Sequence, residues 1–178
     1  MTRIVWKHGL IATAIMLGTF FMVLPFKEQV GFDWGMVVGY TSMVAAFLMV
    51  YFGIRSYRDN VVGGTISFGH AMKVGSLIVA VASTFYVAGW EVYYYGTNGG
   101  QEYMQGYQEY QIAKERAKGT SEAEISKIVE DNRKFAEMYE NPLINSAITF
   151  LEPLPVGILI ALISAGVLSR RRSQPAAA

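Results

Sequence analysis

Residues 34–54 read WGMVVGYTSMVAAFLMVYFGI and contain no charged side chain. A bilayer core roughly 30 Å thick needs about 20 apolar residues in a helix, so this stretch is long enough to cross a membrane. Backbone N–H and C=O groups find no water in the hydrocarbon core, and a helix satisfies them internally. The stretch lacks the strict alternation of a barrel strand and therefore predicts a transmembrane helix.

Three further stretches have the same character. Residues 9–26 and 74–90 carry no charge, and residues 143–169 carry only Glu152. The first stretch also fits a signal peptide, but its end lacks the small-residue cleavage pattern, so we expect a retained helix. The sequence predicts an all-α integral membrane protein with four transmembrane helices, over about residues 5–26, 34–54, 70–95 and 143–169.

The composition agrees with this class and excludes several others. Hydrophobic residues make up 52% of the 178 residues and charged residues 16%, against about 25% charged in soluble domains. The net charge of +1 gives no reason to expect a nucleic-acid partner. Cysteine is absent from the sequence, which excludes disulfides, thiolate catalysis and cysteine-bound metal. We expect no cofactor and no metal site.

Lysine and arginine in short loops indicate the cytoplasmic side of a membrane protein. The loop between the first two predicted spans has only Lys27. Outside the long polar segment 97–141, the bases at or near the other span ends are Arg3, Lys7, Arg55, Arg58, Lys73, Arg170, Arg171 and Arg172. We therefore expect a multi-pass protein of the bacterial inner membrane with both termini cytoplasmic and its basic side against anionic lipid head groups.

Residues 97–141 are polar and predict an extracytoplasmic helical hairpin between the third and fourth spans. A first helix is expected over residues 101–118, and Ser121 with Glu124 forms the capping-box pattern of a second. Three tyrosines at helical spacing share one face of the first helix: Tyr103, Tyr107 and Tyr110. The hairpin is too small for a core of its own, so we expect this face to dock onto the spans or onto a partner.

The cytoplasmic loop after the second span is the other candidate functional segment. Arg55 and Arg58 leave the bilayer, and Gly63-Gly64 permits a tight turn. The loop lacks the glycine-lysine-serine/threonine ending of a phosphate-binding loop. Hydrolytic chemistry has only three candidate side chains and no nucleophile elbow, so we do not expect an enzyme; the three are Asp59, Ser67 and His70.

Three quoted stretches carry a family resemblance: FGIRSYRD…GGTISFGHAMKVG in the loop, KGTSEAEI in the hairpin turn, and NPL…LEPLPVGILIALISAG at the end. Together and in this order they resemble the bacterial membrane-protein family catalogued as domain of unknown function 4199. The resemblance covers about residues 7–172. It implies four helices with a helical hairpin before the last, and it implies no activity.

Small residues four apart lie on one helix face and let helices approach closely in lipid. The predicted packing rows are Gly35 and Gly39 in the second span, and Gly157, Ala161 and Ala165 in the fourth. We favour packing within one bundle, and a homo-oligomer or another membrane protein is the alternative partner. The tail at residues 173–178 is expected to be disordered.

Glu152 is the charge that the apolar pattern does not explain. In a continuous helix it would lie about 13 Å from Leu143, at 1.5 Å per residue, and a carboxylate at that depth is a functional candidate. Pro153 and Pro155 each remove a backbone donor and disfavour helix just before them. We therefore favour a break near Glu152, with Glu152 at the start of the final helix.

These features leave three functions open. The first is a non-enzymatic accessory or scaffold subunit that acts through helix and hairpin contacts. The second is a small oligomeric transporter or proton-coupled permeation protein that uses Glu152 at a proline-broken helix. The third, a membrane enzyme, has the weakest support, because it depends on the few polar side chains of the cytoplasmic loop.

Overall fold

The computed structural model describes residues 1–97 and 99–169, and every regular element in these ranges is helical. The expected basic residues 170–172 and the tail 173–178 lie outside the described residues. In chain order the elements are α1 (Thr2–Val23), the short 3-10 helix η1 (Leu24–Phe26), α2 (Lys27–Asn60), α3 (Phe68–Gly96), α4 (Gly99–Ala117), α5 (Glu122–Tyr139), α6 (Pro142–Leu151) and α7 (Leu154–Leu168).

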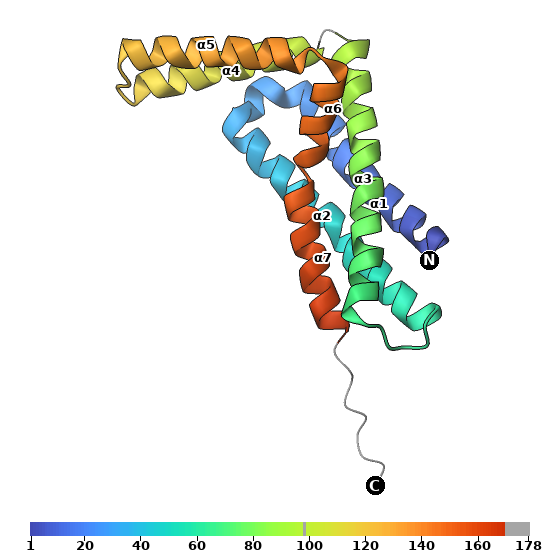
Figure 1. Cartoon of the computed structure of the whole chain (residues 1–178). Helices are drawn as coiled ribbons and strands as arrows, with labels where there is room; N and C mark the ends of the chain where they lie inside the picture. The colour runs from blue at the N-terminus through green and yellow to red at the C-terminus, as the bar shows by residue number, and fades with distance from the viewer. Residues whose placement is uncertain (98, 170–178) are drawn as a thin grey trace.

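The helices form two layers (Figure 1). α1, α2, α3 and α7 make a bundle, and α6 continues α7 toward one end of it. The pair α4 and α5, called the cap below, lies across that end with its two helices side by side. The loop between α2 and α3 lies at the opposite end, beside the end of α7.

Three stretches are long and apolar enough to cross a membrane: Thr2–Asn60, Phe68–Gly96 and Pro142–Leu168. The first contains both α1 and α2, which turn back on each other and pack together. The sequence predicts a loop between residues 26 and 34, and this is wrong, since α2 begins at Lys27. The helical path is interrupted at Gly31, whose φ of 67° and ψ of 170° belong to a region open essentially to glycine alone.

The core of the bundle lies in the half away from the cap. Side chains from α2, α3 and α7 meet there without solvent exposure, among them Phe47, Val50, Ile54, Val74, Ile78, Val79, Ala161 and Ala165. A Cβ added at Gly157 would lie 2.6 Å from the Val79 side chain, so α7 and α3 are as close as their backbones permit. The row Gly157, Ala161 and Ala165 thus lies inside the bundle, where small residues let the helices approach.

A buried polar junction joins α6 to α3 and α5. Trp90 Nε1 donates to Asn145 Oδ1 at 2.9 Å, and Thr149 Oγ1 donates to the same oxygen at 3.2 Å. Asn145 Nδ2 donates to the Tyr139 carbonyl at 3.3 Å, and the Tyr139 and Thr149 hydroxyls lie 3.0 Å apart. Asn145 has no exposed surface. The junction fixes α6 upright beneath the cap.

The cap also contacts the kinked start of α2. Phe32 packs against three tyrosine rings of α4 with centroids 5.2 to 5.6 Å away, those of Tyr103, Tyr107 and Tyr110. Lys114 Nζ lies 2.8 Å from Asp33 Oδ1, and Lys27 Nζ lies 3.6 Å from Glu102 Oε2. Both ion pairs are exposed and contribute little. The tyrosine face of α4 therefore docks onto α2 of the same chain.

Short-range contacts of side chains and turns determine the ends of several helices. Ser121 and Glu124 form a complete capping box at the start of α5, which confirms that prediction. Ser67 caps α3 by accepting from the His70 backbone N–H. Gly119 ends the turn between α4 and α5 with a φ of 82°. α4 begins at Gly99, two residues before the expected start at residue 101.

Candidate functional site

The last apolar segment is broken where the two prolines predict. α6 ends at Leu151 and α7 begins at Leu154. The Glu152 backbone N–H still donates to the Ile148 carbonyl at 3.2 Å, whereas Pro153 has no N–H to continue the ladder. Pro155 is tolerated because it lies in the first turn of α7, where N–H groups lack helical partners.

The predicted place of Glu152 at the start of the final helix needs correction. Glu152 is the C-cap residue of α6, directly after Leu151, and Pro153 lies between it and α7. The carbonyl end of α6 disfavours a negative charge, while the amide end of α7 favours one. The helix termini alone therefore do not explain a carboxylate here, and its surroundings must be considered.

Glu152 lines a cavity of about 560 Å³ between the cap and the bundle, called the chamber below. Its walls come from the helices α1 to α6, and Phe20 is the contribution of α1. The α2 wall includes Gly35, Gly39 and Tyr40; the α3 wall is Tyr86 and Trp90; the α6 wall is Ile148, Thr149 and Glu152; the roof from the cap includes Tyr103, Tyr107, Asn132 and Tyr139. Aromatic rings dominate, and Glu152 is the charged side chain among the described lining residues.

A second cavity of about 320 Å³, the side cavity, lies between α1, the kinked start of α2 and α4. It shares part of its lining with the chamber, at Phe20, Gly35, Gly39, Met43, Tyr86 and Tyr103. Lys27, Glu28 and Glu102 line its other side. The two cavities are therefore adjacent, with the Gly35–Gly39 turn of α2 between them.

Gly35 and Gly39 do not pack against another helix of this chain. No heavy atom lies within 4 Å of a Cβ built at either residue. The packing role predicted for them is therefore wrong within the chain, because the start of α2 leans away from the bundle (Figure 1). Their missing side chains instead leave space in the chamber and in the side cavity.

The chamber opens to the outside of the bundle. Four residues line the chamber and are also exposed on the surface: Met36 and Tyr40 on α2, Phe135 on α5, and Glu152. We call these four residues the mouth. Tyr40 is 52% exposed and Met36 41%. The mouth therefore faces sideways, between α2 and the joint of α6 and α7.

Glu152 forms no ion pair and no side-chain hydrogen bond within residues 1–97 and 99–169. The negative charge of Glu152 nevertheless affects the pKa values of two tyrosines in the roof. Burial raises the pKa of Tyr103, and the Glu152 carboxylate adds to the rise. Burial likewise raises the pKa of Tyr139, with a further contribution from Glu152. These phenols stay protonated at neutral pH and present neutral rings and hydroxyls to the chamber.

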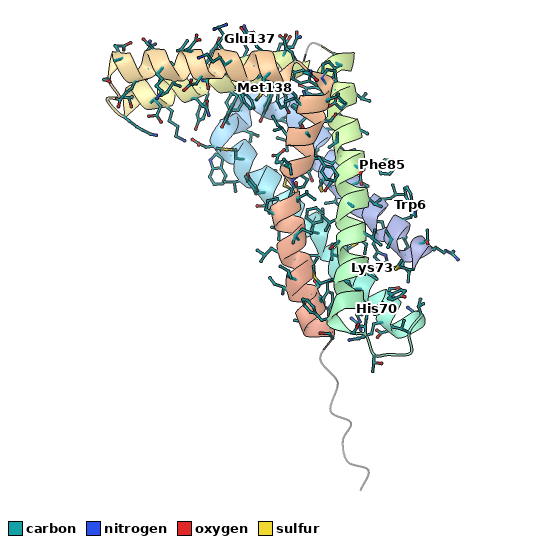
Figure 2. All side chains as sticks on the ribbon, viewed as in Figure 1. Trp6, His70, Lys73, Phe85, Glu137 and Met138 are labelled. Atoms are coloured by element: carbon teal, nitrogen blue, oxygen red, sulfur yellow. The ribbon has the colours of Figure 1, made fainter. Side chains whose placement is uncertain are left out.

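The other predicted site residues lie at the opposite end of the molecule. Arg55 and Arg58 pair with Asp59 at 3.6 and 2.7 Å. Gly63 and Gly64 form the turn with φ of 75° and 91°. Figure 2 shows this separation, with His70 and Lys73 near the loop and Glu137 and Met138 on the cap. The structure does not bring the loop residues to Glu152.

Two of the candidate hydrolytic side chains meet at the start of α3. The Ser67 hydroxyl lies 3.0 Å from His70 Nδ1, and both side chains serve the start of α3. No group of three or more metal-binding side chains occurs in the described part of the chain. The sequence does not mark Tyr86, Asn132 or Tyr139 as lining residues, because Tyr86 on α3 is far along the chain from Asn132 and Tyr139 on α5 and the three share no motif.

The fold and the chamber define a class: a helical protein with three membrane-length apolar stretches and a cap of two polar helices over one end. The chain belongs to the family described as protein of unknown function (DUF4199), whose model matches residues 7–170. The resemblance noted in the sequence is therefore confirmed at family level. Comparisons with curated proteins and with solved structures give no match.

Proposed function

We propose that this chain is a non-enzymatic accessory protein of the membrane that holds an amphiphilic lipid in the chamber beneath its cap. The observation that carries the proposal is the chamber itself, whose apolar and aromatic lining opens through a sideways mouth. Ligand sites are concave, mostly apolar and supplied with a few placed polar groups. A mouth on the bilayer-facing side of a bundle suits a molecule that arrives from the lipid.

The proposal includes four membrane crossings, by α1, α2, α3 and the α6–α7 unit. α1 has 22 residues and α3 has 29, or roughly 33 and 44 Å at 1.5 Å per residue, enough to cross. α1 and α2 lie side by side rather than end to end, which supports counting them as two crossings. In this proposal both termini are cytoplasmic and the cap lies outside the inner membrane, an orientation that the distribution of basic residues supports.

The packing of the bundle favours binding over passage. On the side away from the cap, Phe47, Val50, Ile54, Ile78 and Ala161 have no exposed surface. A solute that entered the chamber would meet this close-packed half, whose opening would require several side chains to move together. The chamber therefore supports a pocket with one opening.

The second candidate, a small oligomeric transporter, is favoured by one observation. Glu152 lies at a break between two helices, as the sites of many transporters do. This candidate expects Glu152→Gln to abolish flux into proteoliposomes while the protein stays folded. Flux that is absent from the unmodified protein, or unchanged in this variant, would exclude it.

The chamber offers a direct test of the proposed function. Gly39→Phe places a ring in the chamber, where a Cβ meets nothing within 4 Å. Gly18→Phe is the matched control, since Gly18 is equally open but lies on the outer face of α1, away from both cavities.

The readout is native mass spectrometry of protein purified in mild detergent. We expect one lipid per chain on the unmodified protein and on Gly18→Phe, and its loss in Gly39→Phe. Lipid retention that is the same in all three proteins would overturn the proposal. Circular dichroism and gel filtration establish that both variants are folded.

A further inference from the structure

We propose that the chamber selects lipids whose head group carries an amine, with the ammonium held against the Glu152 carboxylate. This inference rests on the proposed function and adds the chemistry of the head group. It is carried by three features of the lining: an unpaired carboxylate, a set of aromatic rings around it, and a buried amide donor in the roof.

Within residues 1–97 and 99–169, the Glu152 carboxylate has no cationic partner. Lys27, a base next to the shared α2 wall, faces the side cavity and pairs with Glu102 at 3.6 Å. Lys114, a base on the cap, pairs with Asp33 at 2.8 Å. Because both lysines pair with other acids, Glu152 is the one charged side chain that lines the chamber among the described residues. Glu152 is exposed at the mouth, and a carboxylate that faces lipid without a partner is costly, so a cationic ligand would supply the missing partner.

Aromatic rings surround the same space. Tyr86 and Trp90 form the α3 wall, and Tyr103 and Tyr139 come from the cap. The Trp90 and Tyr103 rings meet edge to face with centroids 6.1 Å apart. Ring faces attract ammonium groups through their quadrupole, and several rings around one cation are a known way to recognise amines. An ammonium ion would thus gain a carboxylate and ring faces together.

The roof supplies a group suited to the phosphate. Asn132 Nδ2 lines the chamber region, is buried and has no hydrogen-bond partner within the part of the chain that is described. Gln108 Nε2 donates to the Asn132 backbone carbonyl at 3.1 Å, which holds this turn of α5 in place. A phosphate oxygen is a strong acceptor for such a free amide. The roof and Glu152 together match a zwitterionic head group.

The surface below the mouth suits acyl chains. Val44 and Leu48 on α2 are 48% and 50% exposed, and Leu159 on α7 is 57% exposed. Met36 and Tyr40 connect this apolar surface to the chamber. A lipid with its head group in the chamber could therefore leave its chains in the bilayer. This continuity favours a lipid over a free soluble amine.

The test measures lipid affinity by native mass spectrometry on the full chain in mild detergent. The probes are phosphatidylethanolamine and phosphatidylglycerol with identical acyl chains, so that the amine is the difference between them. We expect phosphatidylethanolamine to bind about tenfold more tightly, the size of one charge-assisted contact. In Glu152→Gln the preference should disappear.

Glu137→Gln is the matched control, because Glu137 is exposed on α5 and pairs with Arg133 away from the chamber. It should keep the full preference. Free ethanolamine at saturating concentration should not displace the lipid, and displacement would overturn the assignment of a lipid source.

The two proposals fail in different ways. Equal affinity for both lipids, together with loss of binding in Gly39→Phe, would overturn the amine preference and leave the proposed function standing. Lipid binding that is unchanged in Gly39→Phe would overturn the proposed function and, with it, this inference. A preference that survives in Glu152→Gln would overturn the role of the carboxylate.

Discussion

Replacing Asn145 with leucine should release α6 from the cap. The change removes three hydrogen bonds, from Trp90 Nε1 at 2.9 Å, from Thr149 Oγ1 at 3.2 Å and to the Tyr139 carbonyl at 3.3 Å. The two longer bonds contribute about 0.5 to 1 kcal/mol each, and the orphaned indole N–H of Trp90 costs about 1 to 3 kcal/mol. The expected loss is about 3 kcal/mol, because leucine fills a similar volume and leaves no large cavity.

Hydrogen exchange followed by mass spectrometry measures this loss locally. An opening free energy lower by about 3 kcal/mol speeds exchange of the α6 amides about 150-fold. Asn60→Leu is the control, since Asn60 is exposed at the end of α2, and such surface changes stay within about 0.5 kcal/mol. If Asn145→Leu is folded and its α6 amides exchange less than about threefold faster, the Asn145 hydrogen bonds do not hold α6 in place.

Three further predictions concern the kink, the cap and the topology. Gly31→Ala should lower the free energy of unfolding by about 1 to 3 kcal/mol, since its backbone conformation is strained for any other residue; thermal unfolding in detergent measures this, and an unchanged midpoint contradicts it. Hydrogen bonds from Arg133 and Lys134 lower the pKa of Glu130 from 4.5 to about 2. Because the pKa of Glu130 is lower in the folded state, its stabilising contribution is present above pH 4.5 and is lost as the pH falls toward 2. Between pH 7 and pH 3, circular dichroism should show a larger loss of helix in the unmodified protein than in Glu130→Gln, and equal losses would contradict this. The sequence has no cysteine, so Glu130→Cys should react with a membrane-impermeant maleimide on intact cells and Thr65→Cys only after lysis; the reverse pattern would exclude the proposed orientation.

The parts of the fold that local chemistry determines could be predicted from the sequence. Uncharged runs gave the apolar helices, Ser121 with Glu124 gave the start of α5, and Pro153 with Pro155 gave the break before α7. The cap and the break depend on residues within one turn of the feature, and the apolar helices depend on an unbroken run of neighbouring residues. Their physical causes act over a few residues and therefore leave a pattern that a single sequence carries.

The chamber could not be predicted in the same way. The glycine pair in α2 has the spacing of a packing row, yet the kink at Gly31 tilts that part of the helix away from its neighbours. The roof depends on how the cap lies over the bundle, which the Asn145 junction and the contacts of Phe32 decide. Glu152 stood out from the sequence as an unexplained charge, but the residues that line the chamber with it come from six helices, α1 to α6.

An experimental structure in lipid nanodiscs tests most directly whether lipid occupies the chamber in a bilayer. Nanodiscs that contain phosphatidylethanolamine should show an ordered lipid between α2 and the α6–α7 joint, with its amine against Glu152 and its chains leaving through the mouth. A chamber that is closed by movement of α2, or that holds only water while the nanodisc lipid is ordered elsewhere on the protein, would contradict the account.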